Sequence, residues 1–154
     1  MDHRTIEATV SRMLFAIDRL RWDDLEDHFS DRVQIDYTSL FGGDVETLSK
    51  EELLSRWRGL LPGFDATQHM TGPIVVTAAE ANEAVAETHV RGYHYLNDES
   101  WMVAGHYTMR LEHDGTKWRI ASIRLDVYRQ EGNRELPALA LERAASNGKA
   151  HDPF

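Results

Sequence analysis

The sequence contains no cysteine, which excludes disulfide bonds, a thiolate nucleophile and any metal site built on cysteine ligands. Basic residues are few, 17 against 26 acidic ones, which gives a formal charge of −9 at pH 7. They form no cluster, whereas proteins that bind nucleic acid or anionic membranes usually carry a basic patch. We therefore expect neither nucleic acid nor a membrane as a partner.

Long apolar runs are also missing. No stretch approaches the roughly 18 consecutive apolar residues of a transmembrane helix, and the N-terminus, with Asp2, His3 and Arg4, is too polar for a signal peptide. We interpret the chain as a cytoplasmic protein.

Several sequence motifs of metal and cofactor chemistry are absent. The eight histidines form no His-x-His or His-x-x-x-His pair of the kind that binds zinc. The chain also has no Gly-x-Ser-x-Gly nucleophile motif, phosphate-binding loop or dinucleotide fingerprint. The sequence therefore predicts no metal and no cofactor.

The composition is otherwise that of a globular domain, with 42 % hydrophobic and 28 % charged residues among 154. This length suits one domain with a core and a pocket. We assign that domain to residues 1–135. Residues 136–154 are expected to form a short helix, over 136–145, followed by a flexible tail.

The first third of the chain is predicted to be mainly helical. Apolar residues recur every three or four positions from Ile6 to Leu20, which indicates an amphipathic helix. A second helix is expected with Asp23 as its N-cap. Residues 33–37 alternate as in a strand, and Ser49 with Glu52 forms a capping box before a third helix.

The chain after residue 64 has the pattern of strands. We expect them over residues 67–77, 83–96, 101–112 and 117–129, separated by turn-forming residues. Helices followed by consecutive strands predict an α+β fold, with the helices on one face of a curved antiparallel sheet. A four-residue loop over 97–100 would place Leu96 opposite Trp101 and turn His94 toward the core.

Four polar residues lie where apolar ones are expected. Asp18 is four residues after Leu14 on the first helix, and Tyr37 shares a strand face with apolar residues. His69 stands at the start of the sheet, and His94 is predicted to face inward. Each also has a purely structural interpretation: a solvated carboxylate at the edge of the stripe, a core tyrosine, or a buried histidine with a satisfied ring.

Five short segments carry a family resemblance: AIDRLRWD (16–23), VQIDY (33–37), TQH (67–69), YHY (93–95) and KWRI (117–120). In this order and spacing they resemble the SnoaL-like branch of the nuclear transport factor 2-like superfamily, close to the scytalone dehydratase group. The resemblance implies a cone-shaped, cystatin-like fold, in which a strongly bent antiparallel sheet and N-terminal helices enclose a pocket. It also implies that the tail after Glu135 covers the pocket mouth.

The resemblance further implies roles for the four polar residues. Asp18 would pair with His94, His69 would act as the acid and base, and Tyr37 would polarise a substrate carbonyl. The implied activity is that of a cofactor-free lyase that dehydrates a β-hydroxy carbonyl compound. The alternatives are an isomerase or polyketide cyclase of the same fold, or a ligand-binding domain without catalysis.

The expected pocket lining is apolar, which suits a small hydrophobic or aromatic substrate, polyketide- or steroid-like. Its members are Leu14, Val90, Val103, Tyr107, Met109, Ile123 and Leu125. The superfamily often assembles through the outer face of the sheet, so we also expect a homo-oligomer, either a dimer or a trimer.

Overall fold

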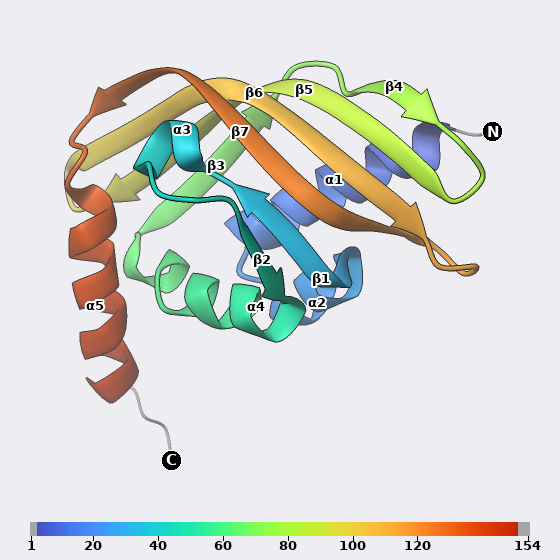
Figure 1. The fold of residues 1–154 in the computed structure, drawn as a ribbon. Helices are drawn as coiled ribbons and strands as arrows, with labels where there is room; N and C mark the ends of the chain where they lie inside the picture. The colour runs from blue at the N-terminus through green and yellow to red at the C-terminus, as the bar shows by residue number, and fades with distance from the viewer. Residues whose placement is uncertain (1–2, 151–154) are drawn as a thin grey trace.

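One curved sheet with helices on its concave side makes up the described part of the chain, residues 3–150 of a computed structural model (Figure 1). The helices are α1 (His3–Asp18), α2 (Trp22–His28), α3 (Thr38–Phe41), α4 (Lys50–Arg58), the 3-10 helix η1 (Leu61–Gly63) and α5 (Leu136–Ala150). The strands are β1 (Phe29–Asp36), β2 (Glu46–Ser49), β3 (Ala66–Thr71), β4 (Val75–Ala79), β5 (Glu83–Leu96), β6 (Glu99–His113) and β7 (Trp118–Gly132).

The strands are ordered β2-β1-β7-β6-β5-β3. β4 also pairs with β5, along the N-terminal part of that strand, while β3 pairs with its C-terminal part. The predicted α+β fold is confirmed. One pairing differs from the antiparallel expectation: β1 runs parallel to β7, so the sheet is mixed. The strand predicted over 67–77 is two strands, because Pro73 between β3 and β4 has no backbone N–H to donate to a ladder.

The helices bury the stripes that periodicity indicates. In α1, Ile6, Val10 and Met13 are at most 1 % exposed, and full burial of each such side chain contributes roughly 1.5–3 kcal/mol. The capping box at the start of α4 is present as predicted. Asp23 is not an N-cap, because α2 begins at Trp22 and its N-cap residue is Arg21. Asp23 lies in the first turn of the helix, where the positive end of the helix dipole stabilises its carboxylate.

The β5–β6 hairpin is tighter than predicted. Its turn is Asn97-Asp98, and Leu96 lies opposite Glu99, not opposite Trp101. The predicted register is therefore wrong by two residues. Because side chains alternate between faces with a period of two, an even error leaves every residue on its predicted face. His94 does lie on the inner face, directly opposite Trp101.

Helix α5 is longer than expected, since it continues through residue 150 and includes the first part of the predicted tail; residues 151–154 lie outside the described residues. It packs on η1, where Ala140 meets Gly63, and then extends away from the sheet (Figure 1). Leu136 and Ala140 are both fully buried. A Cβ on Gly63 would lie 1.8 Å from the carbonyl oxygen of Ala140. Only glycine therefore permits this approach.

None of the helices within residues 3–150 is long and apolar enough to cross a membrane. The cytoplasmic location and the homo-oligomer stay predictions.

Candidate functional site

Asp18 and His69 form a hydrogen-bonded pair where the end of α1 meets β3. Oδ1 of Asp18 lies 2.7 Å from Nδ1 of His69, and Oδ2 accepts the backbone N–H of His69, also at 2.7 Å. The hydroxyl of Thr67 donates to Oδ1 at 2.9 Å. Thr67 and His69 are two apart on a strand, so both side chains point to the same side and reach one carboxylate.

This pair replaces the one expected from the resemblance. The prediction that Asp18 pairs with His94 is wrong, because both carboxylate oxygens are taken by His69 and Thr67. The side chains of His69 and Asp18 are only 11 % and 13 % exposed. Burial raises the pKa of the Asp18 carboxyl, but its hydrogen bonds and the charge interaction with His69 outweigh burial, and the net pKa is lowered.

The pairing fixes which ring nitrogen of His69 is free. A carboxylate only accepts hydrogen bonds, so Nδ1 of His69 carries the proton and Nε2 of the neutral ring is left as a base. Space beside Nε2 is kept open by Gly92, which lies opposite His69 in the β3–β5 pair. A Cβ on Gly92 would lie 3.4 Å from Nε2.

His94 lies next to His69, with ring centroids 5.9 Å apart and the rings nearly perpendicular. Its Nδ1 donates to the carbonyl oxygen of Trp101 at 3.1 Å, and the indole of Trp101 and the ring of Phe64 pack against it. Burial, together with the positive charge that His69 can carry, lowers the pKa of His94 to about 4. His94 is therefore neutral near pH 7.

Tyr37 and Tyr107 supply the hydroxyl groups of the site and are hydrogen-bonded to each other. Tyr37 does not belong to the strand predicted for it; it follows β1 as the N-cap residue of α3. Burial raises the pKa of Tyr37 to about 12, although the hydrogen bond with Tyr107 opposes the increase. Both hydroxyls are protonated near pH 7, so each can donate or accept in this bond, and both tyrosines line the cavity.

These groups meet at a cavity of about 110 Å³. Three of the four predicted catalytic residues, Tyr37, His69 and His94, line it, and Asp18 contacts His69 from behind. The other lining residues are Ile17, Leu40, Phe41, Trp57, Leu60, Leu61, Phe64, Val90, Gly92, Trp101, Val103, Tyr107, Leu125 and Pro137.

The predicted apolar lining is partly right. Val90, Val103, Tyr107 and Leu125 line the cavity. The prediction is wrong for the remaining three, which are at most 3 % exposed in the core and do not reach the cavity: Leu14, Met109 and Ile123.

Sequence reasoning missed the wall formed by α3, α4 and η1. Trp57 and Leu60 belong to the apolar stripe after the capping box, so that stripe was the available signal. Pro137 carries no comparable signal, although its place in the lining agrees with the expectation that the segment after Glu135 lies at the pocket. No group of three or more His, Asp or Glu side chains within residues 3–150 is placed to hold a metal ion.

Comparisons with known proteins agree with this architecture. The model of the SnoaL-like domain matches residues 1–124. The structure of the Kfla4162 protein from Kribbella flavida is similar with a TM-score of 0.83 and 26 % identity, over 89 % of this chain and 97 % of that one. A search of curated proteins finds no match.

Two similar structures are named for elimination reactions. A candidate scytalone dehydratase from Novosphingobium aromaticivorans has a TM-score of 0.73 at 17 % identity, over 83 % of this chain and 85 % of that one. The hexachlorocyclohexane dehydrochlorinase LinA-type3 from Novosphingobium barchaimii has a TM-score of 0.72 at 15 % identity, over 86 % and 90 %. At these identities the likeness shows the fold alone. With the family model matching most of its length, the chain belongs to the SnoaL-like domain family, and its fold is nuclear transport factor 2-like.

Proposed function

We propose that the protein is a cofactor-free lyase that removes water from a small β-hydroxy carbonyl compound, with His69 as the catalytic base. One observation carries the proposal: Asp18 accepts a hydrogen bond from Nδ1 of His69, which leaves Nε2 of the neutral ring as a base, and His69 lines an apolar cavity. An imidazole held in one tautomer by a carboxylate is a common general base.

The reaction needs one base and one hydrogen-bond donor. Nε2 of His69 removes the proton on the carbon next to the carbonyl, and the electrons of the broken C–H bond form an enolate. The hydroxyl of Tyr37 donates to the enolate oxygen. The His69 imidazolium then returns its proton to the β-hydroxyl, the C–O bond breaks, the C=C bond forms, and water leaves. His69 ends neutral, ready for the next substrate.

The surrounding residues support each part of this sequence. The ionised Asp18 stabilises the imidazolium while His69 holds the proton. When Tyr107 donates its proton to the Tyr37 oxygen in their hydrogen bond, the Tyr37 proton is available for the substrate oxygen. General acid–base catalysis of this kind supplies ~10²–10⁴-fold in rate. With its pKa near 4, His94 is not the proton donor at neutral pH; it forms part of the wall.

The two eliminating proteins of similar fold favour the same reaction class, since one is named for loss of water and the other for loss of hydrogen chloride. An isomerase or polyketide cyclase would share the first step, removal of the proton by His69, and would differ by keeping the oxygen.

The test uses cyclic β-hydroxy ketones with the full-length protein and follows products by mass spectrometry. We expect a product lighter by one water, which disappears in His69→Ala. The matched control is His106→Ala, because His106 also contacts a carboxylate, Glu87 at 2.9 Å, but lies outside the cavity. A His69-dependent product of unchanged mass would support the isomerase or cyclase instead. A product that forms equally in His69→Ala would contradict both.

A second measurement isolates the first step. In D₂O, a cyclic ketone without the β-hydroxyl should exchange its α-proton in the wild type and in His106→Ala, but not in His69→Ala. If exchange does not depend on His69, the histidine is not the base.

A further inference from the structure

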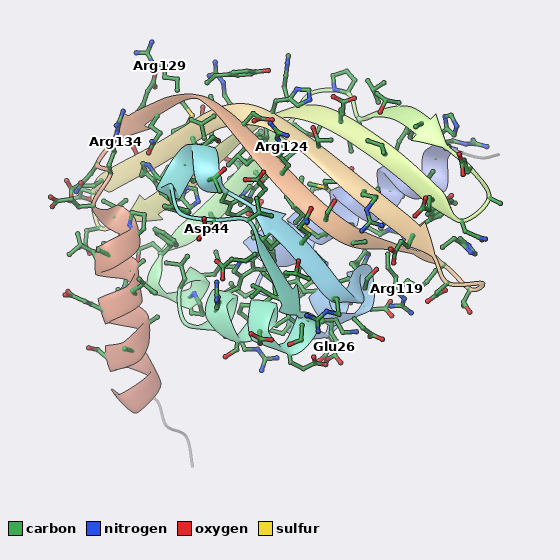
Figure 2. All side chains as sticks on the ribbon, in the orientation of Figure 1. Glu26, Asp44, Arg119, Arg124, Arg129 and Arg134 are labelled. Carbon is green, nitrogen blue, oxygen red and sulfur yellow. The ribbon has the colours of Figure 1, made fainter. Side chains whose placement is uncertain are left out.

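The cavity has no positively charged wall. Within the described residues, none of the side chains that line it is lysine or arginine. Several arginines lie instead at the surface, among them Arg124, Arg129 and Arg134 (Figure 2). Arg143 on α5 pairs with Asp65. A carboxylate or phosphate that entered the cavity would leave water without meeting a counter-charge, which is costly.

A negatively charged side chain lies behind the cavity wall. It is that of Asp18, whose oxygens accept hydrogen bonds from His69 and Thr67. His69 lies between Asp18 and the cavity, so a cationic ligand could not replace its lost hydration by a direct contact with the carboxylate. His94 is neutral near pH 7 for the reason given above. While the His69 ring is neutral, the site offers an anion no positively charged side chain and a cation no direct contact with the carboxylate.

The polar groups that a ligand can reach are few. They are the hydroxyls of Tyr37 and Tyr107 and the rings of His69 and His94, all on residues that line the cavity. The indole N–H of Trp101 is already used, since it donates to Gln130 at 2.9 Å. Neutral hydroxyls and imidazoles of this kind match a neutral molecule that carries a carbonyl and a hydroxyl group.

The size of the cavity limits the ligand further. Its volume is about 110 Å³, below the roughly 150 Å³ of an engineered apolar cavity in another protein that binds benzene. The walls are packed side chains: the Trp101 ring lies 4.4 Å from that of His94 and 6.4 Å from that of Phe41. The wall at α5 is held by the close contact of Gly63 with Ala140. We expect this volume to accept one ring and to exclude a second fused ring.

We infer that the site binds an uncharged molecule with a single six-membered ring, and selects against carboxylates and fused two-ring compounds of the same polarity. This substrate class rests on the proposed function for its relevance to catalysis, but it can be tested by binding alone. It narrows the aromatic, polyketide- or steroid-like class of the sequence prediction to its smallest members.

Two pairs of probes separate charge from size. Benzamide and benzoate have nearly the same shape but differ in charge, and phenol and 2-naphthol have the same polar group but differ by one ring. Titration calorimetry at pH 7.5 with the full-length protein should give at least tenfold tighter binding of benzamide than of benzoate, and of phenol than of 2-naphthol. Apolar area alone predicts the opposite order for the second pair. Shifts of the His69 and His94 ring signals in NMR spectra show whether a probe binds in this cavity.

A cavity variant tests the size argument directly. Leu61→Ala removes side-chain volume from the wall and should bring the affinity for 2-naphthol up to or above that for phenol. Leu139→Ala is the control, because Leu139 is 39 % exposed on α5 and is not part of the lining. If Leu61→Ala does not fold, the wild-type comparison of phenol with 2-naphthol decides the question.

The inference is overturned if benzoate binds as well as benzamide, or if 2-naphthol binds more tightly than phenol to the wild type. It is also overturned if no probe binds at concentrations up to 10 mM, which would mean that every binding free energy is weaker than about 3 kcal/mol. These outcomes are distinct from a failure of the proposed function. The expected order of affinities without any His69-dependent turnover would contradict the lyase alone. His69-dependent dehydration with a different order of affinities would contradict only the substrate class.

Discussion

The low pKa of His94 should make the protein lose stability as the pH falls below 6.5, and His94→Asn should remove that loss. Nδ1 of His94 donates to the Trp101 carbonyl, and an asparagine amide can make a similar donation without titrating. The substitution therefore removes the ionisable group while keeping a hydrogen-bond donor. A constant loss of stability from the smaller side chain is expected at every pH, and only the change with pH is informative.

The magnitude follows from the two pKa values. In the unfolded chain the imidazole has its ordinary pKa of 6.5, and in the folded protein it has a pKa of about 4. Between these values the unfolded chain binds a proton that the folded chain does not, so protonation favours unfolding and stability falls with falling pH. Well above pH 6.5 the His94 ring is neutral in both states, so it does not make the stability depend on pH. At pH 4.5 the loss from this group is about 2.5 kcal/mol.

Urea unfolding at pH 7.5 and pH 4.5 measures this effect. The free energy of unfolding of the wild type should fall by about 2.5 kcal/mol more than that of His94→Asn between the two pH values. Carboxylates titrate in both proteins, so most of their contribution cancels in the comparison. The ring signals of His94 in NMR spectra give a second readout and should change near pH 4. Equal losses in the two proteins, within about 0.5 kcal/mol, would refute the reasoning, as would ring titration near pH 6.5.

Two further substitutions test the catalytic pair and the contact at α5. Asp18→Asn should lower the turnover number at least ~100-fold, because the amide neither fixes the tautomer of His69 nor stabilises its charged form. Steady-state kinetics with the cyclic β-hydroxy ketone that the wild type dehydrates measure this effect, and an unchanged rate would contradict the role of the pair. Gly63→Ala should destabilise the protein by about 2–3 kcal/mol and lower Tm by roughly 5–10 °C, because its Cβ would lie 1.8 Å from the carbonyl oxygen of Ala140. Gly72→Ala is the control in thermal unfolding, since the nearest atom to its Cβ is 3.9 Å away; equal values of Tm for the two variants would show that the α5 contact adapts.

Local hydrophobic periodicity was sufficient to predict the layers of the fold and which face of a strand each side chain occupies. The stripe that includes Ile6 and Val10 is buried in α1. His94 faces inward even though the hairpin turn is two residues shorter than predicted. A period of two makes the face of a residue insensitive to an even error in register, so the pattern predicted orientation better than it predicted partners.

The partner of Asp18 could not be derived in the same way. Both His69 and His94 face the pocket, and the choice between them depends on how β3 pairs with β5. In that pairing Thr67 lies opposite His94, and His69 lies opposite Gly92. The long-range register brings His69 to the end of α1, whereas His94 donates to the Trp101 carbonyl. No pattern within a single segment contains this information.

The Asp18–His69 pair and the outer wall of the cavity come from different parts of the chain. The Asp18–His69 pair links α1 to β3, while Leu40, Leu61 and Pro137 belong to α3, η1 and α5. None of the hydrogen bonds that hold the pair comes from these three elements. Substitutions in them can therefore change which ring fits without moving the base. Such a division would let related enzymes diverge in substrate while keeping one reaction, and it marks α3, η1 and α5 as the segments to randomise when a new substrate is wanted.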